Sequence, residues 1–271
     1  KFNLIYSPRG TLDKYALSFS KFKKQIFYNL FLQKKSLELA DYFHATSEKE
    51  YKEIREMGFS QPIAIIPNPI QKTTMKGNKK RNVISFVGRI HPIKGLDNLL
   101  AAWKEVDHIM KYDLKIYGVW ENKNYVDKLQ NYINKNKIKR VKIYGPIYGE
   151  EKNKLYQTSS FTIFPSFTEN FGNSIGESLM NGTPVLVSDK TPWENVQNLK
   201  CGFIFNNSIG SIKDVLIEIN KIKKSEIENY SINSRNYALK TFSKDIVEDS
   251  FYNFYSWINN KENQPNFIKI N

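Results

Sequence analysis

The sequence predicts an α/β protein with two Rossmann-like domains, each built on a parallel sheet and the first of them incomplete. Short apolar runs alternate with longer amphipathic stretches, which is typical of strands and helices in successive βαβ units. The alternation occurs in two series separated by a polar stretch, and only the second series has enough strands for a complete doubly wound sheet. We therefore predict part of a first domain with a linker at 1–79, a second domain at 80–243 and a C-terminal helical segment at 244–271.

The first series supplies about three strands. Its elements are expected, in chain order, as a strand at 3–7, a helix at 21–39, and strands at 42–46 and 63–66. A further helix begins between the last two strands, where Ser47 and Glu50 have the spacing of a capping box and Gly58 ends the helix. The polar, aperiodic residues 71–80 are typical of a linker.

The second series alternates more regularly. Strands are expected at 83–87, 114–117, 141–144, 161–164, 184–187 and 203–205. Helices are expected between and after them, at 96–106, 125–136, 150–156, 172–180 and from Ser211 onward. The last apolar stretch, 246–258, is rich in aromatic side chains and is expected to be a packed helix.

The composition excludes several classes of protein. Of the 271 residues, 40% are hydrophobic and 25% are charged, which is typical of a globular chain and not of a disordered one. A single cysteine, Cys201, excludes a disulfide framework and a cysteine zinc site, and it favours a reducing, cytoplasmic location. No apolar run is long enough to predict a transmembrane helix.

The net charge of +14 invites a comparison with nucleic-acid-binding proteins. Such proteins use arginine for paired contacts to guanine and phosphate, but only six of the 41 Lys and Arg residues are arginine. The lysine excess accompanies many Asn, Ile, Tyr and Phe residues, all of which AT-rich codons encode. We therefore expect no nucleic-acid partner, and we keep a polyanion-binding protein as the less favoured alternative. The alternative explanation of the charge is attraction to anionic substrates or to an anionic membrane surface.

A first candidate binding loop, Gly88–Gly95, follows one predicted strand and precedes a helix. In an open α/β sheet, ligands bind at the carboxyl ends of the strands, so Arg89 and Lys94 would project cations into the ligand crevice. The loop matches neither the Walker A motif nor the glycine pattern of dinucleotide-binding proteins. Two cations between two glycines suit a diphosphate, and the alternative is a surface loop with incidental charge.

A second candidate, residues 165–177, also lies between an apolar strand and a helix. The backbone N–H groups near Phe171–Ser174 are expected to be first-turn donors, which attract anions together with the helix dipole. Glu169 and Glu177 flank this turn, and carboxylates accept paired hydrogen bonds from the vicinal hydroxyls of a sugar or ribose. A hydrolase with paired carboxylates is the competing interpretation, and stabilisation of the helix start by acidic residues is another.

Together with a third segment, Gly182-Thr183-Pro184-Val185, these loops occur in a characteristic order. The series G-R-x4-K-G, then E-x7-E around N-F-G, then G-T-P-V resembles the retaining nucleotide-sugar glycosyltransferases of family 4, which have the GT-B fold. Four earlier segments resemble the second half of that family's N-terminal domain, namely 7–12, 40–41, 45–48 and 66–68. The resemblance implies two Rossmann-like domains that face a cleft, with the C-terminal helix returning to the first domain.

The resemblance also implies a role for each motif residue. Arg89 and Lys94 would contact the donor diphosphate, Glu177 would hold the ribose hydroxyls, and Glu169 would contact the transferred sugar as the catalytic carboxylate. Backbone amides would touch sugar and phosphate at four positions, namely Asn170, Phe171, Gly172 and Asn173. Gly118 and Ile147 would lie beside the nucleobase. The donor implied is a UDP- or GDP-linked sugar, with no cofactor and no metal ion.

The acceptor implied by the resemblance is a growing bacterial surface glycan, such as capsular polysaccharide or lipopolysaccharide. Many acceptors of this family are lipid-linked, and the lysines of the helix at 21–39 favour peripheral contact with the inner face of the plasma membrane. An ordinary solvated helix face explains these lysines at least as well. The family's glycine-rich loop and its sugar-facing histidine would lie upstream of Lys1, so this chain alone is expected to bind a donor without necessarily transferring it. The alternative is a non-catalytic nucleotide-sugar-binding or scaffold protein.

Overall fold

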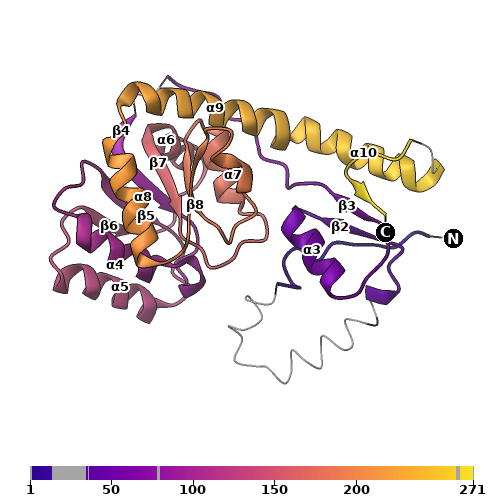
Figure 1. The fold of residues 1–271 in the computed structure, drawn as a ribbon, viewed down its shortest axis with the longest axis horizontal. Helices are drawn as coiled ribbons and strands as arrows, with labels where there is room; N and C mark the ends of the chain where they lie inside the picture. The colour runs from indigo at the N-terminus through magenta and orange to yellow at the C-terminus, as the bar shows by residue number, and fades with distance from the viewer. Residues whose placement is uncertain (1, 14–34, 36, 78–79, 261–262, 271) are drawn as a thin grey trace. The chain divides into compact units, whose positions relative to one another are not determined.

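The computed structural model describes residues 2–13, 35, 37–77, 80–260 and 263–270, so most of the helix expected at 21–39 lies outside the described residues. The chain divides into two compact units (Figure 1). The first comprises Lys1–Pro69, Glu169–Phe171 and Phe242–Asn271, and the second comprises Ile70–Thr168 and Gly172–Thr241. Both contain parallel strands connected by helices, which confirms the predicted α/β fold class.

The first unit holds a sheet in the order β1-β2-β3-β10. Strands β1 (Ile5–Tyr6), β2 (Tyr42–Ala45) and β3 (Ile63–Ile65) run parallel, and α3 (Glu48–Glu56) lies between β2 and β3 in the chain, as predicted. The sequence does not predict β10 (Ile268–Lys269), which pairs antiparallel with β3. Two residues are too few to show the alternation of polar and apolar side chains that marks a strand.

The C-terminal helix α10 (Lys244–Asn260) packs within the first unit. Its buried Val247, Phe254, Trp257 and Ile258 join Tyr42 and Ile66 in one apolar cluster, and burial of this surface stabilises the unit. The rings of Phe254 and Trp257 both meet the ring of Tyr42 edge-on. The aromatic stretch expected to form a packed helix therefore does so.

The second unit is built on a parallel sheet in the order β6-β5-β4-β7-β8-β9. Each predicted strand is present within one or two residues of its expected bounds. The strands are β4 (Arg81–Val87), β5 (Asp113–Tyr117), β6 (Val141–Tyr144), β7 (Ser159–Phe164), β8 (Val185–Ser188) and β9 (Gly202–Phe205). The strand order reverses between β4 and β7, which is the topological switch point at which doubly wound sheets bind ligands.

Helices connect these strands or follow the last of them (Figure 1). They are α4 (Leu96–Val106), α5 (Lys123–Lys135), α6 (Gly149–Thr158), α7 (Asn173–Met180), α8 (Ile209–Lys221) and α9 (Lys224–Phe242). Apolar side chains of the helices and of the sheet form one buried core. The large side chains of Trp103, Tyr112 and Phe161 are fully buried in this core. Of the helices in the described part of the chain, none is long and apolar enough to cross a membrane.

The stretch expected as a linker packs on the second unit over its described residues. Arg235 of α9 donates hydrogen bonds to the carbonyl of Thr73 at 2.6 Å and to its hydroxyl at 3.1 Å. Gln157 of α6 donates to the carbonyl of Thr74 at 3.0 Å. Because side chains satisfy these backbone groups, the division between the compact units falls after Pro69, ahead of the polar stretch.

Candidate functional site

Glycines follow three neighbouring strands at the carboxyl edge of the second sheet. The backbone N–H of Gly88 donates to the carbonyl of Tyr117 at 3.1 Å, and that of Gly118 donates to the carbonyl of Gly145 at 3.3 Å. A Cβ on Gly118 would lie 1.8 Å from the carbonyl oxygen of Gly88, so only glycine fits there. Ile147, half-buried, follows β6 at the same edge. Gly118 and Ile147 therefore lie after adjacent strands, and their place beside the nucleobase stays a prediction.

The loop Gly88–Gly95 is hydrogen-bonded to the loop that follows β7 and packs closely against it. Gly95 has a left-handed conformation with φ of 67°, and a Cβ there would meet the carbonyl oxygen of Pro165 at 1.9 Å. The backbone N–H of Phe167 donates to the carbonyl of Ile93 at 2.9 Å. These contacts hold together the two loops at the topological switch point, which the sequence predicts only as separate candidates.

Arg89 and Lys94 are both carried by the first of these loops. The Arg89 side chain is 58% exposed, and its guanidinium donates to both carboxylate oxygens of Glu121, at 3.2 and 3.3 Å. His91 accepts from the backbone N–H of Ile93 and begins the short 3-10 helix Pro92–Lys94. Burial lowers the pKa of His91, and the positive charges of Arg89 and Lys94 lower it further, against the opposing effect of Glu121. The loop therefore concentrates positive charge at the switch point.

Helix α7 begins on the other side of the switch point. Its N-cap residue is Gly172, at φ of 83°, which has no side chain to accept from the first turn of the helix. The carbonyl of Gly172 accepts from the backbone N–H of Ile175 at 2.8 Å. The positive end of the helix dipole, with Asn173 in its first turn, thus directly follows the loop after β7.

Glu177 lies one turn inside α7, and its carboxylate is paired with side chains of α6. Its carboxylate accepts from the ammonium of Lys152 in α6 at 2.9 Å, and the hydroxyl of Tyr156 lies 3.5 Å from the other carboxylate oxygen. The Glu177 side chain is still 31% exposed. Sequence reasoning misses Lys152 because a pairing across 25 residues depends on how α6 and α7 pack. The ribose-binding role of Glu177 stays a prediction.

The segment Glu169–Phe171 groups with the first unit. Within that unit, the side-chain amide of Asn170 donates to the hydroxyl of Thr46 at 2.9 Å, and the backbone carbonyl of Asn170 accepts from the hydroxyl of Ser47 at 3.1 Å. The structure therefore assigns Glu169, the predicted catalytic carboxylate, to the first unit together with Asn170 and Phe171, whose amides are predicted donor contacts. The other predicted donor contacts belong to the second unit. The structure brings together Arg89, Lys94, Gly118, Ile147, Gly172, Asn173 and Glu177 at one edge of the second unit.

At the carboxyl edge of the first sheet, a buried carboxylate forms the centre of a hydrogen-bonded cluster. Glu50 is 1% exposed and accepts from the backbone N–H groups of Gly10 and Thr46, both at 2.7 Å, and from the hydroxyl of Thr46 at 2.8 Å. Ser47 caps α3 by accepting from the backbone N–H of Glu50 at 3.2 Å. The capping box is thus wrong in its second half, because Glu50 binds Thr46 and Gly10 and not Ser47.

His44 lies beside this cluster and is also satisfied internally. Its Nδ1 is hydrogen-bonded to the hydroxyl of Ser7 and its Nε2 to the carbonyl of Ile66, at 2.5 and 2.8 Å. A carbonyl only accepts, so Nε2 carries the proton and Nδ1 accepts from Ser7. Burial lowers the pKa of His44 from its ordinary value.

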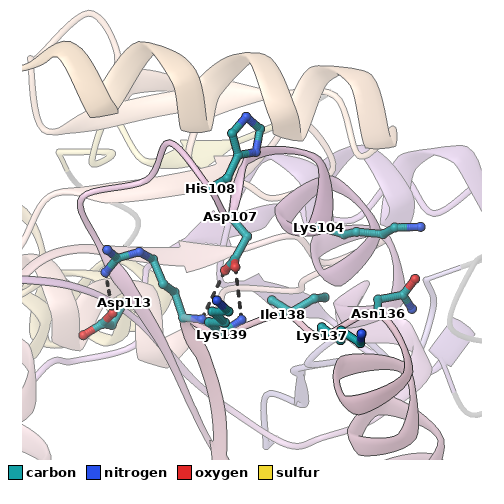
Figure 2. Close-up of a pocket in the computed structure, with 9 residues that line it drawn as sticks. Lys104, Asp107, His108, Asp113, Asn136, Lys137, Ile138 and Lys139 are labelled. Atoms are coloured by element: carbon teal, nitrogen blue, oxygen red, sulfur yellow. Dashed lines mark hydrogen bonds and ion pairs between the residues drawn. The ribbon is translucent and has the colours of Figure 1, made fainter.

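A concave region of about 650 Å³ lies at the opposite, amino edge of the second sheet. It is lined by Lys104, Asp107, His108, Asp113, Asn136, Lys137, Ile138, Lys139 and Arg140. Asp107 accepts from the backbone N–H groups of Lys139 and Arg140 at 3.0 and 3.1 Å, and Asp113 accepts from the Arg140 side chain at 3.1 Å (Figure 2). None of the predicted donor-binding residues lines this region, so it is separate from the candidate site.

Comparison with solved structures supports the fold. The chain is similar to the sucrose-phosphate synthase of Thermosynechococcus elongatus, with a TM-score of 0.77 and 19% identity over 97% of this chain and 69% of that one. It is also similar to the HepE protein of Anabaena, solved in complex with UDP-glucose, with a TM-score of 0.76 and 18% identity over 94% of this chain and 72% of that one. These likenesses confirm an α/β fold of the GT-B kind.

Comparison with curated proteins gives partial matches. Two uncharacterized glycosyltransferases of Methanocaldococcus jannaschii are 28% identical over 124 residues and 25% identical over 200 residues, which are 46% and 69% of this chain. A 41.2 kDa protein in the cps region of Klebsiella pneumoniae is 25% identical over 202 residues, 70% of this chain. The matches cover 33%, 45% and 53% of these relatives, so the chain spans between a third and about half of their lengths.

The family model for group 1 glycosyl transferases matches residues 70–239. These residues include the loop with Arg89 and Lys94, the start of α7 and the whole parallel sheet of the second unit. The match covers more than half of the chain and nearly all of the second unit. The chain therefore belongs to the group 1 glycosyl transferase family.

Proposed function

We propose that the protein is a retaining glycosyltransferase that moves a sugar from a nucleotide-sugar donor to a bacterial surface glycan. One observation carries this proposal: the loop with Arg89 and Lys94 is bonded to the loop that leads into α7, at the topological switch point of the second sheet. Cations and a helix N-terminus side by side are suited to a diphosphate. Family membership makes a nucleotide-sugar the natural source of that diphosphate.

In this proposal the second unit stabilises the leaving group. As the bond between the sugar and the diphosphate breaks, negative charge grows on the departing nucleotide. Arg89, Lys94 and the start of α7 would stabilise this charge electrostatically, because cations and helix N-termini attract a developing anion. This electrostatic role needs no metal ion and no cofactor.

The rest of the donor would be bound around the diphosphate. Glu177 would accept from the ribose hydroxyls, and Gly118 and Ile147 would lie beside the base. Glu169 would contact the transferred sugar, and the amides of 170–173 would touch sugar and phosphate. Retention at the anomeric carbon follows the family resemblance alone.

The comparisons support a UDP-linked donor and a surface glycan. The HepE structure contains UDP-glucose, and the Klebsiella relative is encoded in a cps region. We therefore propose UDP as the first nucleotide to test and GDP as the second. The acceptor proposed is a polysaccharide or a lipid-linked glycan, at the cytoplasmic face of the membrane.

Membrane contact is a separate part of the proposal, because it depends on the basic sequence at 21–39. The full chain should sediment with anionic vesicles at low salt and stay in solution with neutral ones, since lysines are attracted to anionic lipid. Equal sedimentation with both kinds of vesicle would contradict membrane contact and leave the donor proposal intact.

Donor binding and transfer are tested in two steps. First, thermal unfolding of the full chain is measured with UDP, GDP, ADP and CMP, where a ligand at about 100 times its dissociation constant should stabilise by about 2.7 kcal/mol. Second, the nucleotide-sugar that binds is incubated with glycan acceptors, and NMR reports the anomeric configuration of the product. Inversion would contradict the retaining mechanism, and a chain that binds no nucleotide would contradict the proposed function.

A further inference from the structure

We propose that Lys152 is a positioning residue that holds the Glu177 carboxylate for the donor ribose and so favours ribonucleotides over deoxyribonucleotides. The inference rests on the proposed function, in which Glu177 binds the ribose. The Lys152 ammonium donates to Oε1 of Glu177 at 2.9 Å, and the hydroxyl of Tyr156 lies 3.5 Å from Oε2. A carboxylate that is approached at both oxygens is restricted in rotation, whereas an unpartnered glutamate samples several rotamers.

The two helices are also joined by contacts that do not involve Lys152. Asn181, at the end of α7, donates to the carbonyl of Glu177 at 2.9 Å and to the side chain of Asn153 at 3.3 Å. Gln157 of α6 donates to the side-chain oxygen of Asn181 at 3.0 Å. These contacts hold the backbone of Glu177 against α6. We therefore expect the loss of the Lys152 side chain to release the carboxylate and to leave the helices packed.

Tyr156 is a fixed donor beside the same carboxylate. Its side chain is fully buried, and burial followed by the negative charge of Glu177 raises its pKa well above the ordinary value. The phenol consequently keeps its proton at neutral pH. Lys152 and Tyr156 thus approach Glu177 from one side, that of α6.

The carboxylate retains capacity for a ligand. Its two oxygens offer about four acceptor positions, and the two contacts described use about half of them. The side chains of Lys152 and Glu177 are 23% and 31% exposed, so a ligand has access to the pair. The remaining positions match the two hydroxyls of a ribose, whereas a 2′-deoxyribose supplies only one.

Lys152 also offsets an electrostatic cost. A carboxylate near a bound diphosphate repels it, because like charges at short range disfavour each other. A neighbouring ammonium reduces that repulsion, because its positive charge offsets the charge of the carboxylate. Lys152 is accordingly expected to improve binding of the whole nucleotide through Glu177 and to act most strongly on the ribose.

The test compares UDP with 2′-deoxy-UDP, and GDP with 2′-deoxy-GDP, by titration calorimetry on the full chain. Lys152→Met should weaken binding of the ribonucleotide about five- to tenfold and that of the deoxy ligand less than about twofold, because only the ribonucleotide uses the positioned carboxylate fully. Lys152→Arg should retain most of the affinity. Lys154→Met removes the same charge from an exposed site on the same helix, and it should change neither the affinity for the ribonucleotide nor that for the deoxyribonucleotide.

A double variant shows whether Lys152 acts through Glu177. The combination of Lys152→Met and Glu177→Gln should bind UDP about as weakly as Glu177→Gln alone, since coupled residues are not additive. Thermal unfolding of each variant without ligand checks that the fold is retained. Additive losses of affinity in the double variant, or equal losses for the ribonucleotide and the deoxyribonucleotide, would overturn this inference and leave the proposed function intact. A wild-type chain that binds neither UDP nor GDP would overturn the proposed function and this inference with it.

Discussion

The carboxyl edges of the two sheets use ionisable side chains in opposite ways. In the first unit, Glu50 and His44 are 1% and 3% exposed, and backbone groups and short side chains bind their polar atoms. In the second unit, Arg89 is 58% exposed and Glu177 is 31% exposed, and each is paired with one oppositely charged side chain. An ionisable side chain whose hydrogen bonds are all made within its own unit stabilises the fold, whereas an exposed side chain with one partner is available to a ligand.

Removal of Glu50 should have the largest effect, on stability. Glu50→Ala leaves the buried N–H group of Thr46 and the partly buried N–H group of Gly10 without an acceptor, and a buried unsatisfied group costs about 1–3 kcal/mol. We expect the free energy of unfolding to fall by roughly 3 kcal/mol, measured by urea denaturation. Glu48→Ala is the matched control, because Glu48 lies in the first turn of the same helix but is exposed. An equal loss in both variants would show that Glu50 stabilises only as a first-turn acid.

In the second unit, removal of a cation should weaken ligand binding and leave stability nearly unchanged. Arg89→Ala or Lys94→Ala should weaken nucleoside diphosphate binding by about 1.5–3 kcal/mol, the range for hydrogen bonds to charged groups. Nucleoside binding should change little, because the nucleoside lacks phosphate. Lys139→Ala, an exposed lysine at the opposite edge of the sheet, controls for net charge. Equal losses for nucleoside and diphosphate would contradict the assignment.

The buried His44 should make stability depend on pH. Its pKa is lowered in the folded state, first by burial, so below about pH 6.5 the unfolded chain binds a proton that the folded chain resists. Stability should therefore fall as the pH drops below this value, by up to ~1.4 kcal/mol for each unit of difference between the two pKa values. His44→Gln should flatten the slope of melting temperature against pH between pH 7.5 and 5. The exposed His108 offers the comparison: if His108→Gln flattens the slope as much, His44 is not its source.

The smallest effect should come from Glu121, the partner of Arg89. Glu121→Gln removes a carboxylate that competes with the diphosphate for the guanidinium. Because the pair is exposed, we expect diphosphate affinity to increase by only about 0.5 kcal/mol at low salt. Titration calorimetry at low and high salt measures the difference in diphosphate affinity between the variant and the wild type, and screening at high salt should abolish it. A decrease in affinity would show that Glu121 orients Arg89 for the ligand.

The sequence predicts the second sheet well because its central strands β7 and β8 are buried on both faces and are bounded by polar and glycine-containing segments. It also places Arg89, Lys94 and Glu177 near one edge, since parallel strands end at the same edge. The partners of these residues are less accessible to sequence reasoning. Glu121 and Lys152 are paired by the packing of loops and helices distant in the chain, a property without a periodic signal.

The first unit shows the same limit more clearly. The spacing of Ser47 and Glu50 predicts a capping box. Instead, the backbone N–H of Gly10, 40 residues earlier, donates to the Glu50 carboxylate. A local motif indicates which polar groups need partners and not which ones they obtain. The short strand β10 is missed for a related reason, because its place is set by the partner strand β3.

The absence of side chains at Gly95 and Gly118 limits how this site can diversify. Any other residue at these positions would collide with a backbone carbonyl, at 1.9 and 1.8 Å respectively, so neither position accepts gradual change. Altered donor preference in descendants of this chain would have to arise in the surrounding side chains, such as Ile147 or Asn173. Random mutagenesis selected for a new donor sugar should accordingly yield changes around these two glycines and spare the glycines themselves.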